Sequence, residues 1–282
     1  MIKEGRLSYD WARSHMQILD NTINHFKKSK PLKGITLGFC LHITKETSVL
    51  LMGAKELGAT KQEVHRNLVR LEHSGLISKD KEGRYALTTF GRVTCLQLPT
   101  TLFLSQHLDY FEDHDFGNIP HKYMMRCGQL AFGTHIKGIT KTLEKWKNIY
   151  KNADEYIYEI LSEIPGDLFD PLIKKVKSGV KFQYIVSESA SVPQGRKAEL
   201  KKSGFYKLIE NGLIERKMRK TVKVIIVLNE KEACVCFPNL NGEADLTEMF
   251  YGNDYQFHEW CIDYFKDCWS DADLFIESKL KE

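Results

Sequence analysis

The sequence predicts a protein of mixed fold class, α+β and α/β, in which a small helical head precedes a mixed-sheet domain. Two patterns predict it. Residues 54–91 carry helix start and stop signals followed by a short two-stranded pattern, and residues after 115 alternate between strand-like and helix-like runs. With 282 residues, 42% of them hydrophobic, the chain is long enough for two or three packed domains.

Residues 54–75 have the pattern of a helix-turn-helix. A short first helix, residues 54–57, is expected to stop at Gly58. Thr60 and Glu63 are three residues apart and predict a capping box at the start of a second helix. The second helix would be the one that a DNA-binding module presents to the major groove.

A β-hairpin is expected directly after this helix, which Gly75 should end. Residues 76–78 and 84–87 predict two short strands joined by a charged turn with a glycine at its tip. Thr88 or Thr89 is expected to cap the next helix. Helix, turn, helix and hairpin in this order predict a winged helix-turn-helix. The N-terminal residues, which are described below, do not have the usual pattern, so the first helices of this winged helix are expected to be altered.

The second helix has an apolar stripe (Val64, Leu68 and Leu71), and its opposite face can donate hydrogen bonds to DNA. Arginine is the commonest reader of guanine, whereas contacts to phosphates orient a protein without reading sequence. Residues 60–92 hold seven Lys/Arg against four Asp/Glu, a modest excess. A winged helix that binds protein instead of DNA is the alternative. The predicted DNA-binding residues are Gln62, Arg66, Arg70, His73, Lys79, Lys81 and Arg84.

Composition sets broad limits on the kind of protein. A net charge of +4 permits nucleic acid as a partner without requiring it. No run of 18 apolar residues predicts a membrane helix, and the N-terminus lacks the apolar core of a signal peptide. Seven cysteines without a CxxC pair predict reduced thiols in a cytoplasmic protein. Cys261 and Cys268 share a helix face, and buried free thiols are favoured there over a redox pair or a metal site.

Beyond the hairpin, residues 89–114 predict one long helix, which Pro99 should kink. It either joins the head to a second domain or partner subunit, or packs on its own domain. The last helix, residues 255–268, is expected to bury Phe257, Trp260, Cys261, Tyr264, Phe265 and Cys268. Between these helices the sequence predicts strands at 153–161, 180–187, 212–218, 221–229 and 232–238, a helix at 167–179 that Asp167 or Asp170 caps, and a hairpin at 222–236.

Two stretches, 114–130 and 237–269, resemble archaeal transcription regulators of the methanogenesis-regulator type. The resemblance implies a winged helix joined to an effector-sensing domain that is phospholipase-D-like but lacks the catalytic machinery. The matching residues are Asp115, Ile119, Pro120, Arg126, Phe237, Pro238, Gly242, Asp245, Asp254, Phe257, His258, Trp260, Cys261 and Trp269. With the winged helix, it covers about residues 54–270.

The catalytic signature of phospholipase D, H-x-K followed by D, is incomplete in this chain. His135 and Lys137 match its first half, but position 142 is Thr and no second copy exists. We therefore expect His135 to be a structural or surface residue. The sequence predicts no enzyme, no cofactor and no metal.

The first sixty residues do not have the opening of a winged helix, and residues 6–59 resemble the N-terminus of S-adenosylhomocysteine hydrolase. The resemblance centres on CLHITKET at 40–47 and implies nucleoside contacts by His42, Thr44, Glu46 and Thr47. The hydrolase also needs a dinucleotide fold, and no G-x-G-x-x-G follows a strand here. We expect these four residues to be catalytically idle.

The expected organisation has four parts: a hydrolase-like segment (1–53), a winged helix (54–92), a connector (93–114) and a sensing domain (115–282). The expected function is a cytoplasmic, homodimeric transcription regulator that binds double-stranded DNA and an unknown small effector. Alternatives are a nucleoside-binding or hydrolase-related protein acting through the N-terminal segment, and an effector-binding or protein-interaction module without DNA.

Overall fold

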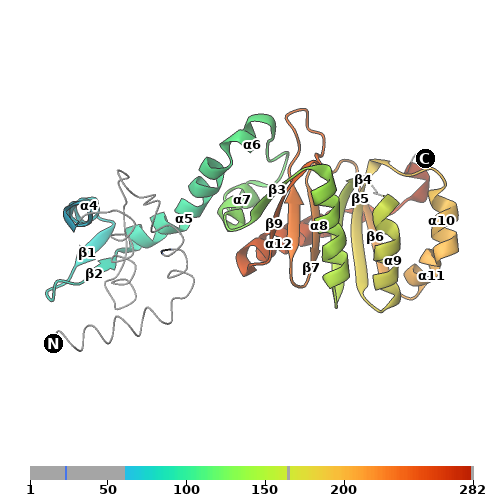
Figure 1. Ribbon diagram of the computed structural model, residues 1–282, viewed down its shortest axis with the longest axis horizontal. Helices are drawn as coiled ribbons and strands as arrows, with labels where there is room; N and C mark the ends of the chain where they lie inside the picture. The colour runs from blue at the N-terminus through green and yellow to red at the C-terminus, as the bar shows by residue number, and fades with distance from the viewer. Residues whose placement is uncertain (1–22, 24–60, 164–165, 281–282) are drawn as a thin grey trace. The chain divides into compact units, whose positions relative to one another are not determined.

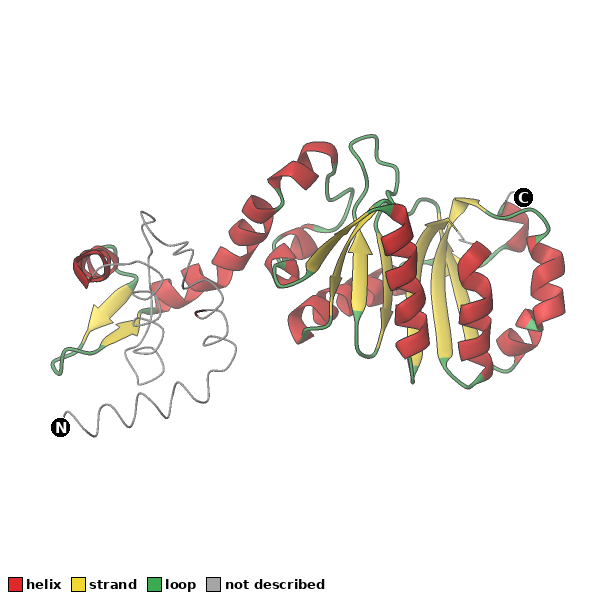
Figure 2. Ribbon diagram, in the orientation of Figure 1, coloured by secondary structure: helices red, strands yellow, loops and turns green. Residues whose placement is uncertain are grey.

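The computed structural model describes residue 23, residues 61–163 and residues 166–280 (Figures 1 and 2). The chain divides into two compact units, Met1–Leu98 and Pro99–Glu282. The expected helix at 54–57, the capping residue Thr60 and the hydrolase-like segment, apart from Ile23, lie outside the described residues.

In the first unit, helix α4 (Lys61–His73) is followed by a β-hairpin of β1 (Ile77–Lys79) and β2 (Tyr85–Leu87). The helix ends because Gly75 adopts a left-handed backbone, with φ of 73°, that a side chain would disfavour. Two backbone hydrogen bonds, from Gly75 N to Glu72 O and from Leu76 N to Leu71 O, close the helix end as a Schellman motif. The predicted second helix and two-stranded hairpin are therefore confirmed.

The predicted single helix at 89–114 is wrong. The segment forms two helices, α5 (Thr89–Gln106) and α6 (Leu108–Asp113), with a break at His107. Helix α5 continues through Pro99. Among the apolar side chains of these two helices, Phe103 is fully buried, whereas Val93, Leu96 and Leu108 are exposed. Thr88 caps α5, because its Oγ1 accepts a hydrogen bond from Gly91 N at 3.0 Å.

The second unit is built on one mixed sheet of eight strands in the order β10-β6-β5-β4-β7-β8-β9-β3. Its strands are β3 (Thr134–Lys137), β4 (Tyr156–Glu163), β5 (Lys181–Ser191), β6 (Ile214–Arg219), β7 (Ile225–Asn229), β8 (Ala233–Cys236), β9 (Glu248–Gly252) and β10 (Asp273–Leu274). Strands β4, β5 and β6 run parallel, and the other pairings are antiparallel. The predicted α+β class with a mixed sheet is confirmed.

Helices cover both faces of this sheet, and a hydrophobic core lies under each layer (Figure 1). The helices are α7 (His121–Met124), α8 (Ile139–Asn152), α9 (Phe169–Lys177), α10 (Arg196–Ser203), α11 (Phe205–Glu210) and α12 (Tyr255–Ser270), with 3-10 turns at Cys127–Leu130, Gly166–Leu168 and Glu277–Lys279. Helices α8 to α11 contribute to one core, and α5, α6, α7 and α12 to the other. Strand β4 shows why two cores form: Ile157 and Leu161 belong to the first, and Ile160, of opposite parity, belongs to the second.

The predicted strands differ from the observed ones mainly at their ends. Strand β7 begins at Ile225, although the apolar pattern predicted a start at 221. The predicted hairpin is confirmed, since Ile225 pairs with Cys236 in the antiparallel β7–β8 pair. Strands β3, β9 and β10 and helices α7, α8, α10 and α11 were not predicted. Helix α10 buries only Arg196 and Leu200, so its sequence has no helical stripe to detect.

Helix α12 confirms the prediction for the C-terminal helix, because all six expected side chains are buried. Asp254 caps it, accepting from Gln256 N and Phe257 N. Cys261 and Cys268 are buried free thiols, as predicted. The expected cap of α9 is wrong: Leu168 occupies the N-cap position without a side-chain hydrogen bond.

Candidate nucleic-acid interface and ligand pocket

Helix α4 presents a polar face made of residues one turn apart. Arg66, Arg70 and His73 follow the i, i+4, i+7 spacing, which places them on one side of the helix. All three are exposed, whereas Leu68 and Leu71 on the other side are half-buried. Gln62 lies on α4 as well, but its side chain lies outside the described residues. The face can offer two guanidinium groups and one imidazole to a polyanion.

The three cationic residues of the hairpin differ in the partners that they contact. Arg84 Nε lies 2.6 Å from Asp80 Oδ2, and Arg84 Nη2 lies 2.9 Å from Glu82 Oε2. Lys79 Nζ lies 5.3 Å from the centre of the Tyr85 ring. Backbone and side-chain hydrogen bonds from Arg84 hold the pKa of Asp80 below its ordinary value, so this carboxylate stays charged.

Lys81 lies at the hairpin turn, is exposed, and has no ion-pair partner among the described residues. Lys79 and Lys81 are therefore the hairpin cations best placed to meet an outside anion, because two neighbouring acids already engage Arg84.

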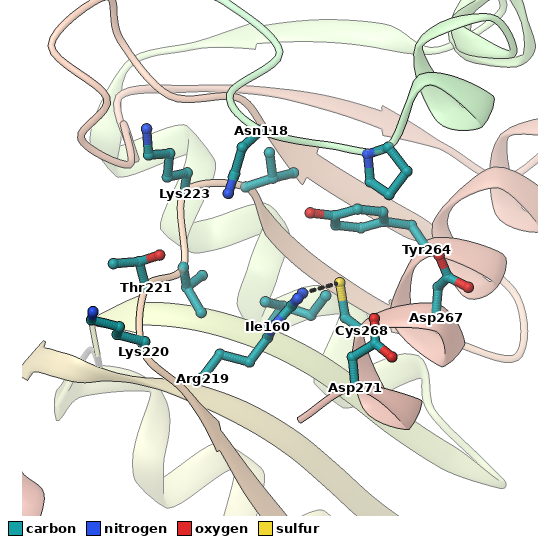
Figure 3. A pocket seen from close by; sticks show the side chains of 13 residues that line it. Asn118, Ile160, Arg219, Lys220, Thr221, Lys223, Tyr264, Asp267, Cys268 and Asp271 are labelled. Atoms are coloured by element: carbon teal, nitrogen blue, oxygen red, sulfur yellow. Dashed lines mark hydrogen bonds between the residues drawn. The ribbon is translucent and has the colours of Figure 1, made fainter. Parts of the chain in front are cut away.

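A second candidate site lies in the Pro99–Glu282 unit, where strand β6 ends at Arg219 (Figure 3). Parallel strands leave a crevice at their carboxyl ends, which is a common place for ligands. The pocket has a volume of about 220 Å³. It is lined by Asn118, Pro120, Ile160, Arg219, Lys220, Thr221, Val222, Lys223, Val224, Tyr264, Asp267, Cys268 and Asp271.

The pocket carries an excess of positive charge. Its cations come from the segment after β6 (Arg219, Lys220 and Lys223), and its two acids come from α12 and the residue after it (Asp267 and Asp271). Lys122 Nζ already pairs with Asp267 at 2.8 Å, which removes one acid from competition for a ligand. These charges suit a small anion more than a cation.

Arg219 is held in place within this pocket. Its Nη1 donates to Cys268 Sγ at 3.0 Å, as the dashed line in Figure 3 shows. Burial raises the pKa of the Cys268 thiol, so the sulfur stays protonated and is a weak acceptor. A weak partner leaves most of the charge on Arg219 available to an anion.

This pocket could not be predicted from the sequence. Its residues come from four segments about forty to sixty residues apart, and only the pairing of the strands brings them together. The cation-rich stretch at 219–223 was the one local signal, but it reads equally well as an exposed strand end.

His135 and Lys137 lie on β3, at the edge of the sheet, with Glu248 of β9 opposite. His135 Nε2 approaches Glu248 Oε2 to 2.6 Å, outside the angles of a good hydrogen bond, and the imidazole stacks on Phe250. Thr142 is fully buried in α8. The structural or surface role expected of His135 stays a prediction. No group of three or more His, Cys, Asp or Glu side chains among the described residues could hold a metal ion.

Comparisons with known proteins match the N-terminal part of the chain only over short stretches. S-inosyl-L-homocysteine hydrolase of Methanocaldococcus jannaschii is 44% identical over 57 residues, which is 20% of this chain and 14% of that protein. Adenosylhomocysteinase of Aeropyrum pernix is 41% identical over 56 residues, again 20% and 14%. The N-terminal resemblance to these hydrolases is confirmed, although this chain spans only about one seventh of their length. No family model matches the chain.

Among solved structures, distant likenesses cover the larger part of the chain. TrmBL2, an archaeal chromatin protein, aligns with a TM-score of 0.41 and 16% identity over 78% of this chain and 86% of its own. NucT from Helicobacter pylori aligns with a TM-score of 0.39 and 12% identity over 51% of this chain and 98% of its own. In the described part of the chain, no helix is long and apolar enough to cross a membrane.

Proposed function

We propose that this protein is a DNA-binding transcription regulator whose Pro99–Glu282 unit binds a small effector and that it is not an enzyme. The observation that carries the proposal is the exposed row of Arg66, Arg70 and His73 on α4, next to a hairpin that presents Lys79 and Lys81. A helix of this length fits the major groove, and an adjacent hairpin can contact the phosphates.

The experiment is a titration of duplex genomic fragments with the full chain and with the Arg66→Ala/Arg70→Ala double variant. A matched control, Lys174→Ala/Lys177→Ala, removes the same charge from exposed positions on α9. We expect the first variant to lose at least about tenfold in affinity and the control to change little. Equal losses in both variants would mean that net charge, and not the α4 face, drives binding.

We propose that the effector is a small anion that binds in the pocket after β6. Arg219, Lys220 and Lys223 supply the positive charge, and about 220 Å³ accommodates a phosphate or a short carboxylate. An effector regulates only if it binds the DNA-competent state and the other state with different affinities. Calorimetric titration of the wild type and of Lys223→Ala with inorganic phosphate and with citrate tests whether this pocket binds anions.

A homodimer is part of the proposal. Phe90, Val93 and Leu96 on α5 are exposed apolar side chains, and soluble proteins tend to cover such groups when they gather. Sedimentation equilibrium should give twice the chain mass, and Val93→Lys/Leu96→Lys should give the mass of one chain.

Nucleoside binding by the N-terminal segment is a second candidate, favoured by the 44% identity with a homocysteine-nucleoside hydrolase. It predicts that the chain binds adenosine or inosine and that His42→Ala weakens this binding, with Thr44, Glu46 and Thr47 as further contacts. Calorimetry that detects neither nucleoside would remove it.

A further inference from the structure

A buried glutamate lies in the core of the Pro99–Glu282 unit, on the face of the sheet opposite to the pocket after β6. Glu159 is in the middle of β4, paired with Tyr184 of β5 and Val227 of β7, and is 1% exposed. Ile157 and Leu161, its neighbours on the same face, are buried apolar residues. A carboxyl group at such a position costs free energy unless partners compensate it.

Both hydrogen bonds to the Glu159 carboxyl group are accepted by the same oxygen, Oε1. Trp146 Nε1 donates to Oε1 at 2.8 Å, and the Tyr150 hydroxyl donates to the same oxygen. No hydrogen bond from any residue of the described ranges reaches Oε2, and no described Arg or Lys side chain pairs with the carboxyl group. One oxygen and the charge of the group therefore lack a partner.

Glu159 lines a small cavity of about 50 Å³ near the carboxyl ends of β4 and β5. Its walls are mostly apolar, with Phe169 and Leu172 from α9, Phe182 from β5 and Phe205 from α11. Gly166 and Pro193, from the loops after β4 and β5, also line it.

Among the described residues, Arg196 is the one cation that lines the cavity, and it is already paired. Arg196 Nη1 lies 2.5 Å from Glu277 Oε1, and Arg216 Nη1 lies 2.9 Å from the other oxygen of Glu277. Arg196 is 5% exposed, so its ion pair with Glu277 is buried in the lining of the cavity. The remaining unmatched charge is that of Glu159, because the other lining acid, Glu199, is exposed to water.

We propose that this cavity is a binding site for a small apolar molecule that ends in an amino group, with the amine donating to the Glu159 carboxylate. An ammonium group would supply the missing charge partner, and a short alkyl chain would contact the aromatic walls. The site is separate from the anion pocket after β6 and from the DNA-binding face, so it does not depend on the proposed function.

The indole N–H of Trp146 reports on the site directly, because it donates to Glu159. The chain has four tryptophans, so few indole signals appear in a ¹⁵N-labelled sample, and Trp146→Phe identifies the one of interest. The full chain is titrated with propylamine, propanol and propionate, three molecules with the same carbon skeleton. Concentrations reach about 50 mM, since a ligand of four non-hydrogen atoms binds weakly.

We expect propylamine to move the Trp146 signal along a saturable curve, propanol to do so less and propionate not at all. Glu159→Gln should weaken propylamine binding at least about tenfold, and Glu144→Gln, the same charge change at an exposed position of α8, should leave it unchanged. Equal shifts with all three molecules, no shift with propylamine, or full affinity in Glu159→Gln would overturn the proposal.

A second variant keeps the test decisive if Glu159→Gln does not fold. A Cβ at Gly166 would lie 3.6 Å from Pro193 Cγ, an ordinary contact, so a side chain fits there without strain. Gly166→Val should narrow the cavity and weaken propylamine binding, while leaving the Trp146 signal of the free protein in place. Unchanged binding in this variant would also contradict the proposal.

Discussion

At the scale of single residues, the most informative feature is how often a charged side chain is already paired inside the protein. Arg84 was predicted to bind DNA, yet Asp80 and Glu82 pair with its guanidinium. Several positions that carry the resemblance to archaeal regulators have structural contacts: Asp245 pairs with His114 at 3.0 Å, and Arg126 pairs with Asp263 at 2.8 Å. Sequence identifies such residues as charged, but only the fold shows which charges remain available.

Removing the acid that holds Arg84 should strengthen DNA binding. In Asp80→Asn the side-chain oxygen can still accept from Arg84 N, as Asp80 Oδ1 does at 2.8 Å, so the hairpin should keep its turn. The loss of one negative charge and the release of Arg84 should raise DNA affinity about threefold to tenfold at low salt. Fluorescence anisotropy with a duplex measures this. Glu144→Gln on α8 is the matched control, and an equal gain there would attribute the effect to net charge.

Glu159 should make stability depend on pH. Burial raises its pKa from the ordinary 4.5 to about 7, although hydrogen bonds from Tyr150 and Trp146 act in the opposite direction. The folded state therefore favours the protonated form, so this contribution is fully present below about pH 4.5 and is lost as the pH rises through about 7.

Glu159→Gln carries no such proton. Between about pH 5 and pH 8, the free energy of unfolding of the wild type should fall relative to that of the variant by about 2.5 kcal/mol. Urea unfolding at a series of pH values measures the difference. A difference that stays constant with pH would show that the folded protein does not raise the pKa of Glu159.

At the scale of elements, the sequence predicted the features that depend on residues close together in the chain. The end of α4 at Gly75, the β1–β2 hairpin and the buried face of α12 all follow from residues within about one helix length of each other. The break at His107 and the late start of β7 were not predicted, because no residue pattern in the local sequence marks either boundary.

Gly91 in α5 gives a test of how closely the helix meets the chain before the hairpin. Glycine inside a helix usually costs free energy relative to alanine, so Gly91→Ala would ordinarily stabilise a helix by about 1 kcal/mol. Here a Cβ would lie 1.9 Å from the carbonyl oxygen of Leu76, a backbone atom that cannot turn away. We expect Gly91→Ala to destabilise the Met1–Leu98 unit by at least about 2 kcal/mol.

Thermal unfolding followed by circular dichroism measures this effect. Gln97→Ala, at an exposed position of the same helix, is the control and should change little. If Gly91→Ala raises the melting temperature instead, α5 does not pack against Leu76 as closely as the structure shows.

At the scale of the whole molecule, the sequence predicted the mixed sheet but neither the pocket after β6 nor the cavity at Glu159. Both lie near the carboxyl ends of parallel strands, and their residues meet only through the order β6-β5-β4-β7. The burial of Glu159 could not be predicted from the sequence. A glutamate between apolar residues of a strand normally marks the solvent-exposed face, but here both faces of the sheet are buried. The N-terminal resemblance was visible because it rests on contiguous residues.

The central claim, that α4 and the hairpin bind DNA, is tested most directly by the salt dependence of binding. The wild type and Lys79→Ala/Lys81→Ala are titrated with the same duplex at several salt concentrations, beside Lys174→Ala/Lys177→Ala. Because the two hairpin lysines contact phosphates in this account, the slope of log K against log salt should fall in magnitude by about two in the first variant and stay unchanged in the control. Identical slopes in all three proteins, or binding no tighter than the nonspecific level of about 10⁻⁴ to 10⁻⁶ M, would contradict the claim.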